Sequence, residues 1–121
     1  MLSLILNHNV FSDEDVLILD EPEVHLHPEW QLKYAQLVIL LQKVFHLTIL
    51  LTTHSPYFLE AVEVYARKYG VDNITNYYIA RNRGNHAEFE EVTGHTDKIY
   101  QEMAEPFDQL NKLRLQMEMD K

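Results

Sequence analysis

Blocks of apolar residues separated by polar turns predict strands and helices in alternation along the first half of the chain. Val16 to Leu19 and Leu47 to Thr52 are short apolar runs of the kind that form buried strands. A first short helix is expected over about Leu2 to Asn7. Between the two strands, Pro28 suits a first helical turn. The apolar residues that follow it keep to one helical face and are Trp30, Tyr34, Leu37, Val38, Leu41, Val44 and Phe45.

A second helix is predicted directly after the second strand. Ser55 is a good N-cap residue and Pro56 suits the first turn, so the helix is expected to start there. It should run to Tyr69 and stop at Gly70, since glycine commonly ends helices.

The last third of the chain predicts a hairpin followed by two helices. Ile74 to Arg81 and Ala87 to Val92 read as strands joined by a polar turn that contains glycine. Thr96 is expected to cap a short helix through Met103. Pro106 should then interrupt the chain before a last helix over about Phe107 to Met117.

Polar residues with catalytic potential follow both predicted strands. Asp20 and Glu21 end the first strand and His54 follows the second. Open α/β sheets bind ligands at the carboxyl ends of their strands. Asp20 can hold a hydrated Mg²⁺ that bridges nucleotide phosphates, and Glu21 can orient or deprotonate an attacking water. Either acid could instead be an ordinary polar strand end, but Pro22 and the downstream histidine favour function.

Three sequence motifs occur in the same order along the chain as in a known class of proteins. Asp20 to Glu23, Leu26 to Gln31 and Thr52 to Pro56 resemble the Walker B, D-loop and H-loop of an ABC-class ATPase. The sequence DEPExxLHPEWQ resembles the non-transporter branch more closely than the membrane transporters. This branch contains the RecF, SMC and overcoming-lysogenisation-defect (OLD) like ATPases. The resemblance covers roughly the first half of the chain. It implies an α/β fold that is part of a P-loop NTPase sheet with flanking helices, followed by the β-hairpin and C-terminal helices.

The resemblance also implies roles for single residues and for cofactors. Asp20 would serve the Mg²⁺ of bound ATP, Glu21 would polarise the hydrolytic water, and His54 would reach the γ-phosphate. The loop from Glu23 to Pro28 would touch the opposite subunit of an ATP-bound dimer. The residues expected on this subunit-facing loop are Glu23, His25, Leu26 and His27.

Two further motifs of such ATPases do not occur in the sequence. The glycines are Gly70, Gly84 and Gly94, and none begins a phosphate-cradling loop before a helix. A signature of the LSGGQ type does not occur either. We therefore interpret residues 1–121 as the C-terminal portion of a single ABC-type ATPase domain. Its partner would be a homodimer mate or the missing N-terminal half, and this chain alone is predicted to be inactive.

The amino-acid composition limits the kinds of partner that this chain is expected to bind. Nineteen acidic against ten basic residues give a net charge of −9, so nucleic acid is expected only through regions outside this chain. The absence of cysteine excludes disulfides and is consistent with a reducing cytoplasm. No apolar run approaches the roughly 20 residues of a membrane span. No membrane span is therefore expected. A transporter subunit could still dock on a membrane partner, so this length alone does not exclude that class, but we expect no membrane partner for this chain.

Three functional hypotheses follow. The first is an ATPase that serves DNA repair or defence against phages and plasmids, an outcome that belongs to the resembled families. The second is a catalytically inactive dimerisation or binding module that keeps the fold. The third is a metal-dependent hydrolase, because His25 and His27 could chelate zinc or a transition metal. The D-loop resemblance explains the same two histidines without a metal.

Overall fold

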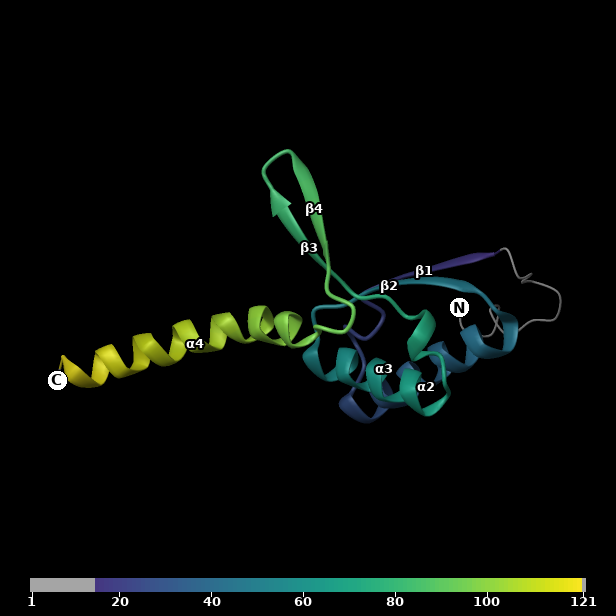
Figure 1. The fold of residues 1–121 in the computed structure, drawn as a ribbon. Coiled ribbons are helices and arrows are strands. Elements are labelled where there is room, and N and C mark those ends of the chain that lie inside the picture. The colour runs from purple at the N-terminus through teal and green to yellow at the C-terminus, as the bar shows by residue number, and fades with distance from the viewer. Residues whose placement is uncertain (1–14, 121) are drawn as a thin grey trace. The chain divides into compact units, whose positions relative to one another are not determined.

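The computed structural model describes residues 15–120. The chain divides into two compact units, the first ending at Ile74 and the second beginning at Thr75 (Figure 1). The helix expected over about residues 2–7 lies outside the described residues. Within residues 15–120, no helix has the length and apolar character needed to cross a bilayer.

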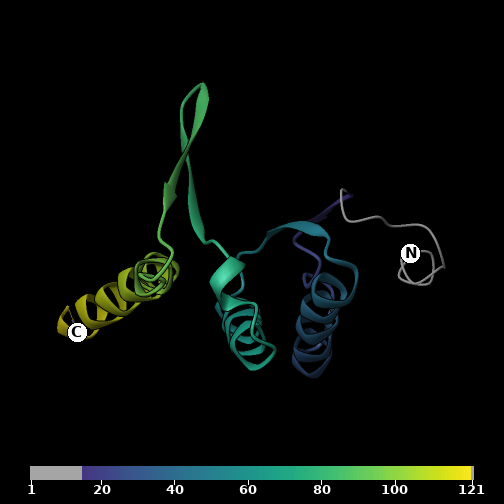
Figure 2. The same ribbon diagram turned by 45° about the vertical axis from the view of Figure 1, so that its right-hand side comes forward.

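The described part of the first unit, residues 15–74, contains two parallel strands, two helices and a 3₁₀ turn. Strands β1 (Val16–Asp20) and β2 (Thr48–Thr52) pair in parallel, from Val16 opposite Thr48 to Asp20 opposite Thr52. Helices α2 (Pro28–Phe45) and α3 (Pro56–Lys68) lie on the same side of this strand pair (Figures 1 and 2). The predicted β-α-β-α order is therefore confirmed. In chain order the elements are β1 (Val16–Asp20), α2 (Pro28–Phe45), β2 (Thr48–Thr52), α3 (Pro56–Lys68) and the 3₁₀ turn η1 (Asp72–Ile74).

Both helices begin where the sequence predicts. Pro28 occupies the first turn of α2, where its missing N–H has no helical partner in any case. Ser55 caps α3, because its side-chain oxygen accepts a hydrogen bond from the backbone N–H of Phe58 at 3.1 Å. Gly70 follows α3 with a φ of 72°, as expected for a residue that ends a helix.

The core of the first unit lies between α2 and α3. It is centred on Phe58, which is fully buried and packs against the ring of Tyr34 with a centroid distance of 6.1 Å. The expected buried face of α2 is wrong in part, because Trp30, Val44 and Phe45 are exposed. The helix is apolar on several sides, so packing against α3 selects the buried face. The buried core residues are Ala35, Ile39, Phe58, Ala61, Val62, Ala66 and Val71.

The strand pair is covered on one face only, within the described residues. Val16, Ile18 and Leu50 lie on the other face and are between 57% and 66% exposed. The expectation that both strands are buried is therefore wrong for this unit taken alone. Parallel sheets are almost always covered on both faces, so an apolar exposed face is unusual for two such strands.

The second unit contains an antiparallel hairpin and one long helix. Strands β3 (Tyr78–Arg83) and β4 (His86–Glu91) are joined by a two-residue turn, Gly84 and Asn85, with Gly84 at a φ of 73°. The hairpin is confirmed, but its first strand starts and ends later than predicted. Helix α4 (Asp97–Met119) follows it.

Helix α4 continues through Pro106, which corrects the two-helix prediction. Proline cannot donate a backbone hydrogen bond, which normally costs about 3 kcal/mol in a helix interior. Glu102 would carry the carbonyl that loses its donor, and α4 is exposed in this region. Water can therefore satisfy that carbonyl and soften the cost. Thr96 precedes the helix without a side-chain capping bond.

Candidate functional site

The tandem acids lie where the two parallel strands end. Asp20 is the last residue of β1 and is opposite Thr52, the last residue of β2. The backbone N–H of Glu21 donates to the carbonyl oxygen of Thr52 at 3.0 Å and to its hydroxyl at 3.1 Å. This edge is the position at which open α/β sheets bind ligands.

His54 lies beside Glu21. Its Nε2 is 3.1 Å from Oε1 of Glu21, and its side chain is otherwise 91% exposed. A carboxylate and an imidazole within hydrogen-bond reach have the geometry needed to move or orient a proton. Asp20, Glu21 and His54 are thus gathered at one edge, although His54 lies 34 positions after Asp20 in the sequence.

Asp20 offers a carboxylate oxygen, the type of ligand that suits Mg²⁺. Its side chain is exposed, and its Oδ1 accepts a hydrogen bond from the Thr52 hydroxyl. Mg²⁺ keeps most of its water and uses only one or two protein carboxylates together with substrate phosphates. A single exposed carboxylate at a strand end fits that pattern.

The backbone of Glu21 is strained. Its φ is 45°, in the left-handed region that residues other than glycine and asparagine rarely adopt. Such conformations cost about 1–3 kcal/mol and concentrate at functional sites. This bend lies directly after the last residue of β1, at the residue whose carboxylate contacts His54.

The loop after Glu21 has one residue turned inward. Glu23 is only 3% exposed, and its Oε1 accepts a hydrogen bond from the Thr53 hydroxyl. Its Oε2 has no hydrogen-bond partner among residues 15–120. Burial raises the pKa of the nearby Tyr34 phenol, and the Glu23 charge raises it further. Because the whole residue is buried, Glu23 presents almost no surface to another subunit in this structure.

The other residues of the predicted subunit-facing loop are more accessible. His25 and His27 are exposed and Leu26 is half-buried. The Leu26 carbonyl accepts a hydrogen bond from Nε2 of Gln31 at 3.0 Å, which ties the loop to α2. Across the described residues, no three His, Cys, Asp or Glu side chains are placed to share a metal ion.

We expect no stoichiometric metal at His25 and His27. Alternate residues in a loop need not converge on one ion, and a tight site needs three or four ligands. Elemental analysis of protein prepared without a histidine tag should find no zinc, nickel or manganese in proportion to chain. One tightly held ion per chain, lost in His25→Ala but not in the exposed control His86→Ala, would support the hydrolase hypothesis instead.

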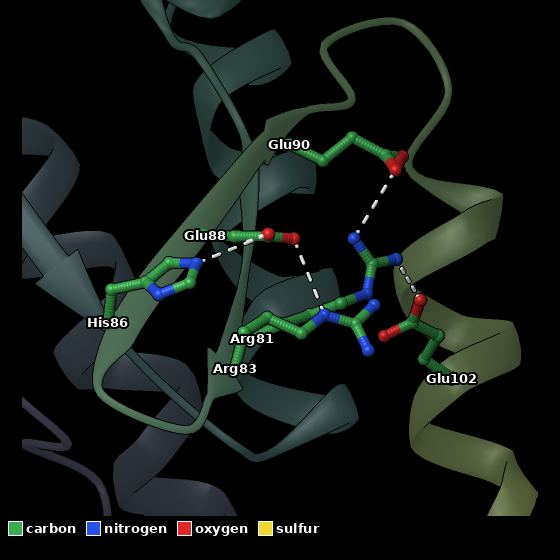
Figure 3. A network of polar contacts seen from close by, with 6 residues as sticks. All are labelled: Arg81, Arg83, His86, Glu88, Glu90 and Glu102. Atoms are coloured by element: carbon green, nitrogen blue, oxygen red, sulfur yellow. Dashed lines mark hydrogen bonds and ion pairs between the residues drawn. The ribbon is translucent and has the colours of Figure 1, made fainter.

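The hairpin arginines are engaged with acids. Arg81 pairs with Glu90 at 3.3 Å and with Glu102 of α4, and Arg83 pairs with Glu88 at 3.3 Å (Figure 3). The hydrogen bond to Glu102 is the main cause that raises the pKa of Arg81. Arginines at a turn could also contact phosphate, but this network favours a structural role for both.

The sequence did not predict that threonine hydroxyls link the segment around Asp20 to Glu23 with the segment around Thr52 and Thr53. Thr52 and Thr53 served only as context for His54, yet their hydroxyls donate to Asp20 and Glu23. The Ser55 hydroxyl also lies 3.4 Å from Oε1 of Gln31. The run of hydroxyl residues on both sides of His54 was the available signal.

Comparison with known families finds a match, which lies within the first half of the chain. Residues 7–60 match the sequence profile of a family described as "AAA domain, putative AbiEii toxin, Type IV TA system". This match supports a non-transporter AAA, P-loop ATPase family. The matched segment contains Asp20, Glu21 and His54. The mixed α/β architecture is compatible with part of a P-loop NTPase. No solved structure matches the chain.

Proposed function

We propose that this chain supplies the metal-handling and water-handling part of an ATP-hydrolysing site, in an ATPase of the ABC class related to the RecF, SMC and OLD branch. The supporting observation is the contact between Glu21 and His54 at a strand edge that also carries Asp20. ATP would supply the phosphoryl group, and the Asp20 carboxylate would balance part of the positive charge of the Mg²⁺ bound to it.

Each residue has a role that its position permits. Asp20, exposed at the end of β1, would hold the hydrated Mg²⁺. Glu21 would polarise the attacking water, since it is a carboxylate next to the metal-binding acid. His54, exposed apart from its contact with Glu21, would reach the γ-phosphate. In this proposal Asp20 and Glu21 are the Walker B pair and His54 is the H-loop histidine.

The site would be completed by another segment or a second subunit that carries a phosphate loop. The exposed apolar face formed by Val16, Ile18 and Leu50 supports this idea, because helices cover both faces of the parallel sheet in a complete α/β domain. The loop with His25, Leu26 and His27 would then face the opposite subunit. We call the protein that contains this chain together with a phosphate loop the assembled ATPase.

The wider role that we infer is DNA repair or defence against phages and plasmids in the cytoplasm. The net charge of −9 argues that any nucleic-acid contact is made elsewhere in the assembled ATPase. An inactive dimerisation module is the competing outcome. Measurement of ATP turnover by the assembled ATPase separates the two.

Asp20→Ala should weaken Mg²⁺-dependent ATP binding by at least about tenfold, because the metal loses its protein anchor. Calorimetric titration of the assembled ATPase with ATP, with and without Mg²⁺, measures this effect. Glu60→Ala removes an exposed carboxylate from α3 and should leave binding unchanged. Equal Mg²⁺-dependent affinity in wild type and Asp20→Ala would remove Asp20 from the metal site.

A further inference from the structure

Thr52 makes more contacts with the tandem acids than any role in strand pairing requires. Its hydroxyl donates to Oδ1 of Asp20 and accepts from the backbone N–H of Glu21 at 3.1 Å. Its carbonyl accepts from the same N–H at 3.0 Å. One hydroxyl has one donor and two acceptor sites, so both bonds can exist together.

The position of Thr52 relates directly to the strain at Glu21. A φ of 45° is unfavourable for glutamate and persists only where surrounding contacts hold it. The shared N–H bond to Thr52 is such a contact. It fixes the peptide that turns the Glu21 carboxylate toward His54, 3.1 Å away.

The adjacent hydroxyl holds the other side of Glu21. Thr53 donates to Glu23, which is buried, and accepts a hydrogen bond from the Ser55 N–H at 3.0 Å. Glu21 therefore lies in the sequence between Asp20, which is bonded to Thr52 at the end of β2, and Glu23, which is bonded to Thr53 directly after it.

We propose that Thr52 is a positioning residue for the ATPase reaction, a role that rests on the proposed function. It orients the Asp20 carboxylate for Mg²⁺ and keeps Glu21 in the bent conformation that faces His54. Thr48 provides a natural comparison, because it is an exposed threonine of the same strand and the same face but lies four residues from the site.

The first arm of the test needs no nucleotide. Amide hydrogen exchange at Glu21 is measured by NMR in the full 121-residue chain. Thr52→Val keeps the shape and strand preference but loses the hydroxyl, so the Glu21 amide should exchange about two- to tenfold faster relative to its neighbours. Thr52→Ser should restore slow exchange, and Thr48→Val should leave it unchanged.

The second arm uses the assembled ATPase. A partner that orients a metal ligand typically contributes about 10- to 100-fold to metal affinity or activity. Thr52→Val should therefore raise the Mg²⁺ concentration needed for half-maximal turnover by at least about tenfold. Thr52→Ser and Thr48→Val should behave as wild type, a pattern that a general loss of stability would not produce.

The two arms separate failure of this role from failure of the proposed function. Unchanged Glu21 exchange in Thr52→Val overturns the positioning role whatever the turnover shows. A wild-type assembled ATPase without turnover defeats the proposed function, and the exchange arm then decides the role of Thr52 alone. With turnover present, an unchanged Mg²⁺ requirement in Thr52→Val also overturns the role.

Discussion

The assembled ATPase carrying Glu21→Gln should bind Mg²⁺ and ATP as tightly as wild type but lose turnover by at least about 100-fold. General-base catalysis contributes about 10²- to 10⁴-fold, and an amide can neither accept the proton nor carry the negative charge. Glutamine is nearly isosteric with glutamate. Its amide oxygen can still accept a hydrogen bond from His54, so the geometry of the site should survive.

Two measurements separate binding from chemistry in this variant. Calorimetry gives the ATP affinity, and phosphate release gives the turnover number. Glu60→Gln makes the same chemical change at an exposed position of α3 and should alter neither. Wild-type turnover in Glu21→Gln would remove Glu21 from the role of water-polarising base.

The gathering of Asp20, Glu21 and His54 could be predicted because it depends on topology. Two apolar runs joined by a helix form parallel strands, and parallel strands end at the same edge. The polar residues that follow the two strands must therefore meet. The start of α3 was equally accessible, since Ser55 and Pro56 act through local backbone chemistry.

Other features of the site depend on contacts that local patterns do not encode. The positive φ of Glu21 has no sequence signal, because glutamate is not among the residues that favour it. The burial of Glu23 depends on a partner, Thr53, that lies 30 positions away. Neither the conformation of Glu21 nor the hydrogen bond between Glu23 and Thr53 could be assigned before the register of β1 against β2 was known.

The errors in the predicted elements have physical causes as well. Pro106 was expected to end a helix, but α4 is exposed there and water can replace the lost donor. The buried face of α2 was predicted from apolar spacing alone. Trp30 and Val44 are apolar yet lie away from α3, so they are exposed in this unit. Spacing cannot select a face when apolar residues occur on several sides of a helix.

Residues 1–121 alone should not bind ATP with a dissociation constant below about 1 mM. Most of the affinity in P-loop ATPases comes from backbone amides and a lysine around the β- and γ-phosphates. The sequence has no such loop. Asp20 and Glu21 are negative and repel a polyphosphate that lacks this cradle. Hydrolysis by the chain alone should be undetectable for the same reason.

Calorimetric titration of the 121-residue chain with Mg²⁺ and ATP tests this expectation, with the assembled ATPase as the positive control. Dispersed NMR amide signals should accompany the absent heat change, so that an unfolded sample is not mistaken for a folded one without affinity. A micromolar dissociation constant that Asp20→Ala abolishes would contradict the expectation. Asp20, Glu21 and His54 would then belong to a site that is complete without a phosphate loop, and no second segment would be needed to bind the nucleotide.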